Sequence, residues 1–469
     1  MKRYLFISIF ALLGLAPRDF SSPPPPPPPN IIVILTDDQG YGDVGFNGCK
    51  DIPTPGIDRI AANGTVFTSG YVSYAVCGPS RAGLITGRYQ DRFGFSRNPV
   101  LAPNDSTVGL PHNEQTMADL LKQAGYSTAA FGKWHLGAHP TLHPNRRGFD
   151  DFYGFLSGGH RYFPEELIPT IGSQLRSQNE GYRTRLMRNS AHVDEQEYLT
   201  DAFSREAANY IRSHKNNPFF IYLAYNAPHA PMQATEKYLK RFEHIKDEKR
   251  KTYAAMVSAV DDGVNKLLNL LDELKLTDNT IVFFLSDNGG PIPDNSSSNG
   301  VLRGKKGDLY EGGVRVPFAV QWPGQIPAGL KYDSPVISLD IFATAANLAG
   351  VKPKNPIDGV NLLPYLKGVK KGMPHDVLFW RMYDRNLFAV RSAVSKMVIS
   401  KENTELFDVN NDIAEKNNLA GAQKKQVNAL NKQLQRWKNQ IIDPLFLGLN
   451  QDAEYSRTHP DRWQINGEF

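Results

Sequence analysis

Short, wholly apolar segments that alternate with helical stretches constrain the fold of this chain most strongly. Residues 31–35 read Ile-Ile-Val-Ile-Leu, without one polar position. Such a run is typical of a parallel strand that is buried on both faces, because a strand with one solvated face alternates apolar and polar residues. Three further segments, at residues 128–131, 219–223 and 281–285, are candidates for buried strands.

Segments with helical periodicity lie between these predicted strands. We expect helices at residues 55–63 (closed by Gly64), 116–123, 198–213 and 253–274. Strands that alternate with helices over most of a chain predict an α/β fold, in which a large, mostly parallel sheet is sandwiched by helices.

The texture of the sequence changes after about residue 374. Four short strand-like segments follow one another at residues 377–380, 387–391, 395–399 and 405–408, and a polar, amphipathic helix is expected at 423–440. This order predicts a smaller antiparallel sheet plus helix. We therefore divide the chain into a leader at 1–29, a catalytic domain at 30–374 and a C-terminal subdomain at 375–469.

The first 29 residues have the features of an export signal and a spacer. Lys2 and Arg3 precede an apolar stretch at residues 4–15, which is typical of a secretory signal peptide and too short to span a bilayer comfortably. The proline run at 23–29 predicts a stiff polyproline II linker. The sequence therefore predicts a secreted or periplasmic protein. It contains no apolar run that is long enough to predict a membrane span.

Composition excludes several classes of protein. A net charge of +5 over 469 residues, with no block of lysine and arginine, makes nucleic acid a poor first hypothesis. Cys49 and Cys77 are the only cysteines, too few for a disulfide scaffold or a cysteine-based zinc site. A soluble enzyme is the class that remains.

Two of the apolar strands lead directly into acidic and amide side chains followed by glycine. Asp37 and Asp38 follow the first strand, and Asp287 and Asn288 follow the strand at 281–285. Either motif alone is also typical of an ordinary turn, but ligands of α/β sheets bind at the carboxyl ends of strands. The recurrence of the motif therefore predicts a site for Ca²⁺ or Mg²⁺, the ions that prefer oxygen ligands.

A cysteine and several cationic side chains form a second group of candidates. Cys77 lies just before Pro79, near a predicted helix start, where the helix dipole lowers a thiol pKa; a buried structural cysteine is the alternative interpretation. Lys133 and His135 are two residues apart and would face the same pocket if the strand before them continues in extended geometry. Strand ends and glycine-rich loops also carry other cationic or histidine side chains that could complete an anion site: Arg81, His229 and Lys306.

The motifs around these residues closely resemble those of the formylglycine-dependent sulfatases, which belong to the alkaline-phosphatase-like superfamily. Residues 77–81 read Cys-Gly-Pro-Ser-Arg with Leu-Ile-Thr-Gly behind them at 84–87, and residues 132–137 read Gly-Lys-Trp-His-Leu-Gly. The resemblance extends from about Asn30 to residues 405–408 and on through 415–419. It implies an alkaline-phosphatase-like fold and the hydrolysis of sulfuric esters.

The resemblance also implies a role for each matching residue. Cys77 would be oxidised to formylglycine by a formylglycine-generating or anaerobic sulfatase-maturing enzyme, and its hydrate would bind the metal together with Asp37, Asp38, Asp287 and Asn288. The remaining roles are implied in the same way: Arg81 would activate the hydrate, Lys133 and Lys306 would hold sulfate oxygens, His229 would protonate the leaving alcohol, and His135 would assist sulfate release. Lys305 stands where many relatives have glycine, and it is an alternative to Lys306 as the residue that holds sulfate oxygens.

The substrate is expected to be a sulfated carbohydrate, because the sequence resembles bacterial polysaccharide sulfatases. A sulfated galactan such as carrageenan is preferred. His160 and Arg161 are candidate substrate-binding residues, with a structured loop that binds no ligand as the alternative. Two other functions compete. One is a formylglycine-dependent phosphodiesterase or phosphonate monoester hydrolase. The other is a catalytically inactive, glycan-binding relative, which is disfavoured because every catalytic position carries the residue that the resemblance requires. A two-zinc phosphatase is disfavoured because Asp287-Asn288 replaces its usual Asp-His pair.

Overall fold

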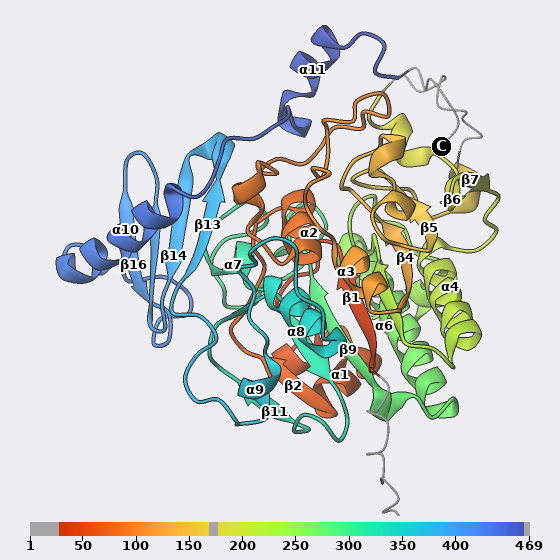
Figure 1. Ribbon diagram of the computed structural model, residues 1–469, viewed down its shortest axis with the longest axis horizontal. Helices are drawn as coiled ribbons and strands as arrows, with labels where there is room; N and C mark the ends of the chain where they lie inside the picture. The colour runs from red at the N-terminus through yellow and green to blue at the C-terminus, as the bar shows by residue number, and fades with distance from the viewer. Residues whose placement is uncertain (1–27, 168–176, 464–469) are drawn as a thin grey trace, which may run out of the picture.

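A ten-stranded mixed sheet forms the centre of the protein. The computed structural model describes residues 28–167 and 177–463 (Figure 1). The predicted signal peptide and most of the proline run therefore lie outside the described residues. The strand order is β11-β2-β10-β9-β1-β8-β4-β5-β6-β7. The strand bounds are β1 Asn30–Thr36, β2 Gly64–Phe67, β4 Ser127–Lys133, β5 Asp151–Phe155, β6 Leu186–Arg188, β7 Ala191–Val193, β8 Phe219–Ala224, β9 Thr280–Ser286, β10 Phe318–Gln321 and β11 Leu330–Tyr332.

The central strands β9, β1, β8, β4 and β5 are parallel neighbours, and all four predicted buried strands are among them. β1 pairs with β9 in a register that sets Leu35 opposite Leu285 and Thr36 opposite Ser286. The residues that follow these two strands therefore leave the sheet side by side. This register brings the two acidic motifs of the sequence to one place.

Helices cover both faces of the sheet. On one face, alternate β1 residues Ile31, Val33 and Leu35 share a buried cluster with helices α2, α3 and α8; on the other, Ile32 and Ile34 pack with α1, α4 and α6. The bounds of the helices are α1 Pro55–Ala62, α2 Cys77–Thr86, α3 Met117–Gln123, α4 Leu199–His214, α5 Glu236–Leu239, α6 Glu248–Glu273, α7 Glu311–Val314, α8 Leu339–Ala349, α9 Leu363–Leu366, α10 Lys424–Lys438 and α11 Asp452–Thr458. The predicted fold class is confirmed.

A four-stranded antiparallel sheet and helix α10 stand beside the main sheet (Figure 1). Its strands are β13 Leu378–Met382, β14 Leu387–Arg391, β15 Ser395–Ile399 and β16 Thr404–Asp408; the short strands β3 Gly70–Tyr71 and β12 Val336–Ile337 form a separate parallel pair. Leu430, Leu434 and Trp437 of α10 pack into the core cluster of the small sheet. The predicted antiparallel sheet plus helix is therefore confirmed.

A buried ion network joins the small sheet to the main domain. The Lys396 ammonium of β15 lies 2.8 Å from a Glu311 carboxylate oxygen and 3.4 Å from one of Glu415, and all three side chains are fully buried. Arg315 and the Tyr71 hydroxyl contact the other oxygen of Glu311. Because Glu311 opens α7, which follows the loop carrying Lys306, the network anchors that loop.

We expect Lys396→Met to destabilise the protein by about 3–5 kcal/mol, since it leaves two buried carboxylates without their shared cation. Chemical unfolding measures this loss. Lys432→Met is the matched control, because Lys432 is exposed on α10 and its replacement should change the free energy of unfolding by less than about 0.5 kcal/mol. Equal losses in the two variants would show that the buried network does not stabilise the fold.

Several local predictions were wrong at their edges. Gly64 does not close α1: Asn63 is the C-cap and Gly64 begins β2, an antiparallel neighbour of β10. Helix α6 starts at Glu248 rather than at 253, because the Asp247 side chain caps it by accepting a hydrogen bond from the Arg250 backbone.

Among the described residues, no helix is both long and apolar enough to cross a bilayer.

Candidate active site

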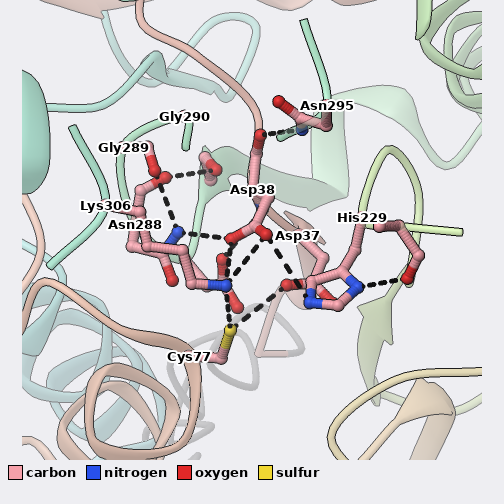
Figure 2. A network of polar contacts seen from close by, with 12 residues as sticks. Asp37, Asp38, Cys77, His229, Asn288, Gly289, Gly290, Asn295 and Lys306 are labelled. Carbon is pink, nitrogen blue, oxygen red and sulfur yellow. Dashed lines mark hydrogen bonds and ion pairs between the residues drawn. The ribbon is translucent and has the colours of Figure 1, made fainter. Parts of the chain in front are cut away.

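The carboxyl ends of β1 and β9 hold the four predicted oxygen ligands together, and Figure 2 labels three of them, Asp37, Asp38 and Asn288. The Asp38 backbone N–H donates to Asp287 Oδ1 at 3.2 Å, and Asn288 Nδ2 donates to Asp38 Oδ1 at 2.7 Å. Single ligand atoms of Asp37, Asp38, Asp287 and Cys77 all lie within 4.8 Å of one another. All of these side chains are buried.

The donor set fits a hard divalent cation. Carboxylate and amide oxygens are the ligands that Ca²⁺ and Mg²⁺ prefer. Asn288 Oδ1 is buried and has no hydrogen-bond partner among the described residues, so one oxygen of the set is left for an ion. Asp38 has a left-handed backbone with φ of 64°, a strained conformation for a non-glycine residue that is typical of functional sites.

Cys77 lies in the first turn of α2, directed at this cluster. Its Sγ lies 3.5 Å from Asp37 Oδ1 and 3.2 Å from Lys306 Nζ. Burial raises the pKa of the Cys77 thiol to about 12, with Asp287 and Asp37 adding to the rise against Lys133 and Lys306. The predicted lowering of this pKa by the helix start is therefore wrong, and the unmodified thiol is protonated at neutral pH and a poor nucleophile.

Arg81 and Lys133 neutralise the carboxylates from the side of α2 and β4. Arg81 is four residues after Cys77 on the same helix face, and its Nε and Nη2 contact Asp287 Oδ2 at 2.9 and 2.8 Å. Lys133 Nζ lies 2.6 Å from Asp37 Oδ2. Burial alone would raise the pKa of Asp37, but Lys133, His229, Arg81 and Lys306 hold it well below its usual range.

The structure separates the two adjacent lysines. Lys306 Nζ contacts both oxygens of Asp38, at 2.7 and 2.8 Å, as well as the Cys77 sulfur. Lys305 is exposed, and its backbone N–H donates to Asp308. Burial alone would lower the pKa of Lys306, but the nearby negative groups, Asp38 above all, raise this pKa well above its usual value. Lys306 is therefore a permanent cation in the site.

The two histidines have different surroundings. His229 Nε2 lies 3.6 Å from Asp38 Oδ2, and its Nδ1 is 2.6 Å from the Ala230 carbonyl oxygen. His135 is fully enclosed, and neither ring nitrogen has a hydrogen-bond partner among the described residues. Burial, with Lys133 and Arg81, lowers the pKa of His135 well below its usual value, so its ring is neutral in the site.

The extended geometry assumed for residues 133–135 is not observed, because His135 is left-handed with φ of 57°. The side chain of His160 is buried. Its ring stacks on Phe155, and its nitrogens lie 2.9 and 2.8 Å from the carbonyl oxygens of Arg161 and Thr184. These contacts oppose the predicted direct role of His160 in substrate binding and favour the structured-loop alternative. Arg161 is partly exposed and pairs with Glu166 at 3.3 Å.

Two positioning residues were not predicted. Asn98 Oδ1 accepts a 2.7 Å hydrogen bond from the Gly78 N–H and so holds the first turn of α2. Asn295 Nδ2 donates to the Asp38 carbonyl oxygen at 3.1 Å and to that of Pro228 at 3.3 Å (Figure 2). Neither asparagine stands in a motif, and their roles depend on loops that only the fold brings to the site.

The charges of the cluster are balanced. Three carboxylates, Asp37, Asp38 and Asp287, face three cationic side chains: Arg81, Lys133 and Lys306. A divalent cation held by these carboxylates would leave the pocket with a net positive charge. Such a pocket attracts a small anion and stabilises negative charge that develops on it.

Comparison with known proteins identifies the family. Residues 29–351, more than half of the chain, match the family model described as Sulfatase, and residues 305–441 match a second one described as N-sulphoglucosamine sulphohydrolase, C-terminal. The chain belongs to the sulfatase family, within the alkaline-phosphatase-like superfamily. The predicted family and enzyme class are confirmed.

Three relatives show how far the similarity extends. Human (Homo sapiens) N-acetylgalactosamine-6-sulfatase is 36% identical over 372 residues, which cover 76% of this chain and 67% of the relative. The crystal structure of Ps i-CgsB in complex with k-i-k-neocarrahexaose is 40% identical, with a TM-score of 0.85, and covers 92% of this chain and 97% of that one. The PsFucS1 sulfatase from Pseudoalteromonas sp. is 26% identical, with a TM-score of 0.75 and coverage of 88% and 90%.

Proposed function

We propose that this sulfatase removes sulfate from a sulfated galactan of the carrageenan type. The observation that carries the reaction is the position of Cys77 Sγ at the carboxyl end of β1, 3.5 Å from Asp37 Oδ1 and 3.2 Å from Lys306 Nζ. The galactan is supported by Ps i-CgsB, which is 40% identical over nearly its whole length and was solved with a neocarrahexaose bound.

The proposal includes two groups that the chain must acquire. Cys77 would be converted to formylglycine, whose hydrate supplies an oxygen nucleophile and a route for releasing sulfate. Asp37, Asp38, Asp287 and Asn288, together with the modified residue 77, would hold Ca²⁺, or alternatively Mg²⁺, which lowers the pKa of a bound hydroxyl. A maturation enzyme would have to act before folding is complete, because Cys77 is 2% exposed in the folded chain.

The chain's own residues would bind the sulfate and move the protons. Lys133 and Lys306 would hold the sulfuryl oxygens and stabilise negative charge that grows in the transition state. Arg81, fixed by Asp287, would orient residue 77. His229, the more accessible histidine, would protonate the leaving alcohol oxygen, and the neutral ring of His135 would accept a proton from residue 77.

Removal of the metal should destabilise the protein. A cation that binds only the folded state stabilises it by mass action, by about 2.7 kcal/mol at a concentration one hundred times its Kd. We therefore expect chelation to lower the Tm and added Ca²⁺ to restore it. Asp287→Asn is the control, because its Tm should respond less to chelator. Elemental analysis that finds stoichiometric zinc and little calcium would contradict the assignment.

A panel of position-defined sulfated galactose oligosaccharides, assayed by released sulfate, tests the proposed function. Wild-type protein should hydrolyse at least one of them, while a Cys77→Ala preparation corrects for contaminating sulfatases. A phosphonate monoester and a phosphodiester are assayed in parallel. Faster hydrolysis of these esters would favour the competing hydrolase, and turnover of glycosaminoglycan sulfates alone would replace the galactan.

Export is also part of the proposal. The basic and apolar residues at the start of the chain support a signal peptide, and therefore a secreted or periplasmic enzyme that meets its polymeric substrate outside the cytoplasm. Sequencing the N-terminus of protein recovered from the native host tests this, because an exported chain should lack the residues 1–15.

A further inference from the structure

A side pocket of about 180 Å³ opens between the main domain and the small sheet, next to the catalytic cluster. We propose that it binds the sugar adjoining the one that loses its sulfate and that Arg385 recognises an anionic group, such as a second sulfate, on that sugar. The proposal rests on the proposed function only in taking a sulfated oligosaccharide as substrate. The residues that carry the argument are Val76, Arg97, Asn98, Arg385, Asn450 and Gln451.

The pocket shares its wall with the catalytic residues. Val76 directly precedes Cys77, and Asn98 accepts a hydrogen bond from the Gly78 N–H. On the other side, Arg385 donates to the carbonyl oxygen of Gly307, the residue after Lys306. A group in the pocket would therefore lie against Val76, which adjoins Cys77, and against Arg385, which is bonded to the residue after Lys306, as expected for a neighbouring unit of one substrate.

The pocket offers hydrogen-bond donors that the protein itself does not use. The side-chain amide nitrogens of Asn98, Asn450 and Gln451 donate to no other residue in the described ranges; the carbonyl oxygens of Asn98 and Gln451 are the atoms that bond to the backbone. Unused donors next to a volume that holds about six waters favour a polar, hydroxylated ligand.

The two arginines of the pocket are not equivalent. The Arg97 guanidinium donates hydrogen bonds to Asp384 and to the Phe446 carbonyl oxygen, and the side chain is only 15% exposed. Arg385 contacts Gly307 and Asp308 through Nη1 alone, and its side chain is 53% exposed. Its remaining N–H groups are therefore available to an anion. Asp308 pairs with Arg385 at 3.1 Å and so partly neutralises it. We therefore expect Arg385 to contribute to substrate affinity about as much as one charge-assisted hydrogen bond.

Segments from distant parts of the sequence build the pocket. Arg385 comes from the turn between β13 and β14, Asn98 from a loop after α2, and Asn450 and Gln451 from the segment that runs from the small sheet to α11 over the main domain (Figure 1). The pocket therefore belongs to the folded chain as a whole, and the small sheet contributes to substrate choice as well as to stability.

Two substrates and two variants test the proposal. Arg385→Gln should lower kcat/KM for a multiply sulfated oligosaccharide by roughly tenfold, mainly by raising KM. For a monosulfated monosaccharide the loss in kcat/KM should be about twofold or smaller. Asn450→Ala, in the turn that precedes α11, should show the same selectivity with a loss of about threefold. Arg212→Gln is the matched control, since Arg212 is also 53% exposed and paired with a glutamate, but lies on α4. It should not discriminate between the substrates.

Three outcomes would overturn the proposal. Equal losses on both substrates would show that Arg385 only supports the Lys306 loop through Gly307. No loss in either variant would show that the pocket holds no part of the substrate. Selective loss in Arg212→Gln as well would point to general charge attraction. If wild type hydrolyses a sulfated glycosaminoglycan and no galactan, the proposed galactan fails, and the same variants are compared on the glycosaminoglycan.

Discussion

Cys77→Ala should reduce sulfate ester hydrolysis by at least about 10³-fold, to near background, while the protein stays folded. The expected loss is large because residue 77 supplies the nucleophile, and removing a nucleophile removes the whole covalent route. The measurement is the rate of sulfate release from one sulfated sugar, with an unfolding curve for each protein.

The control for this prediction separates chemistry from folding. Cys77 is buried, so its replacement by alanine should cost about 1 kcal/mol of stability, too little to unfold the protein. Cys49→Ala removes the other cysteine, which is partly buried outside the cluster, and should retain activity. Substantial turnover by Cys77→Ala would show that residue 77 is not the nucleophile.

Lys306→Ala should lower kcat by roughly 10²–10³-fold, since it removes a cation directed at the charge that develops in the transition state. The structure gives the reason for choosing this lysine: its Nζ lies 3.2 Å from the Cys77 sulfur, at the entrance to the carboxylate cluster. Steady-state kinetics on a small sulfated sugar measures the effect.

Lys305→Ala is the matched control one residue away. Lys305 is exposed, so its loss should mainly raise KM, the pattern of an interaction that binds substrate and transition state equally. A larger fall in kcat for Lys305→Ala than for Lys306→Ala would transfer the catalytic role to Lys305. Tm measurements in the presence of Ca²⁺ keep the comparison free of folding effects, because Lys306 also neutralises Asp38.

The parts of the fold that the sequence predicted are those set by strong local patterns. β1, β8 and β9 are buried on both faces and therefore read as largely apolar runs, and β4 contains the shorter apolar stretch Ala129–Phe131. The outer strands β2, β6, β7, β10 and β11 have three or four residues each, too few to show a period, and they form because the neighbouring strand offers hydrogen bonds. Their pairings, which are antiparallel except for the parallel pair of β11 and β2, are a property of the whole sheet.

The site divides in the same way. The clustering of Asp37, Asp38, Asp287 and Asn288 was predictable, because a strand end followed by acidic residues and glycine is a local signal with a physical meaning. The contact between the His160 ring and Thr184, a residue from a distant segment, could not be predicted, because sequence spacing contains no information on it. The high pKa of Cys77 likewise results from burial, which outweighs the nearby cations and the helix start.

The proposed chemistry depends on the state of residue 77, which is measured as the mass of the peptide that contains it, from protein purified in active form from its native host. We expect residue 77 to carry an aldehyde or its hydrate in place of the thiol, in proportion to the sulfatase activity of the preparation. Fully active protein in which residue 77 is an unmodified cysteine would contradict the account.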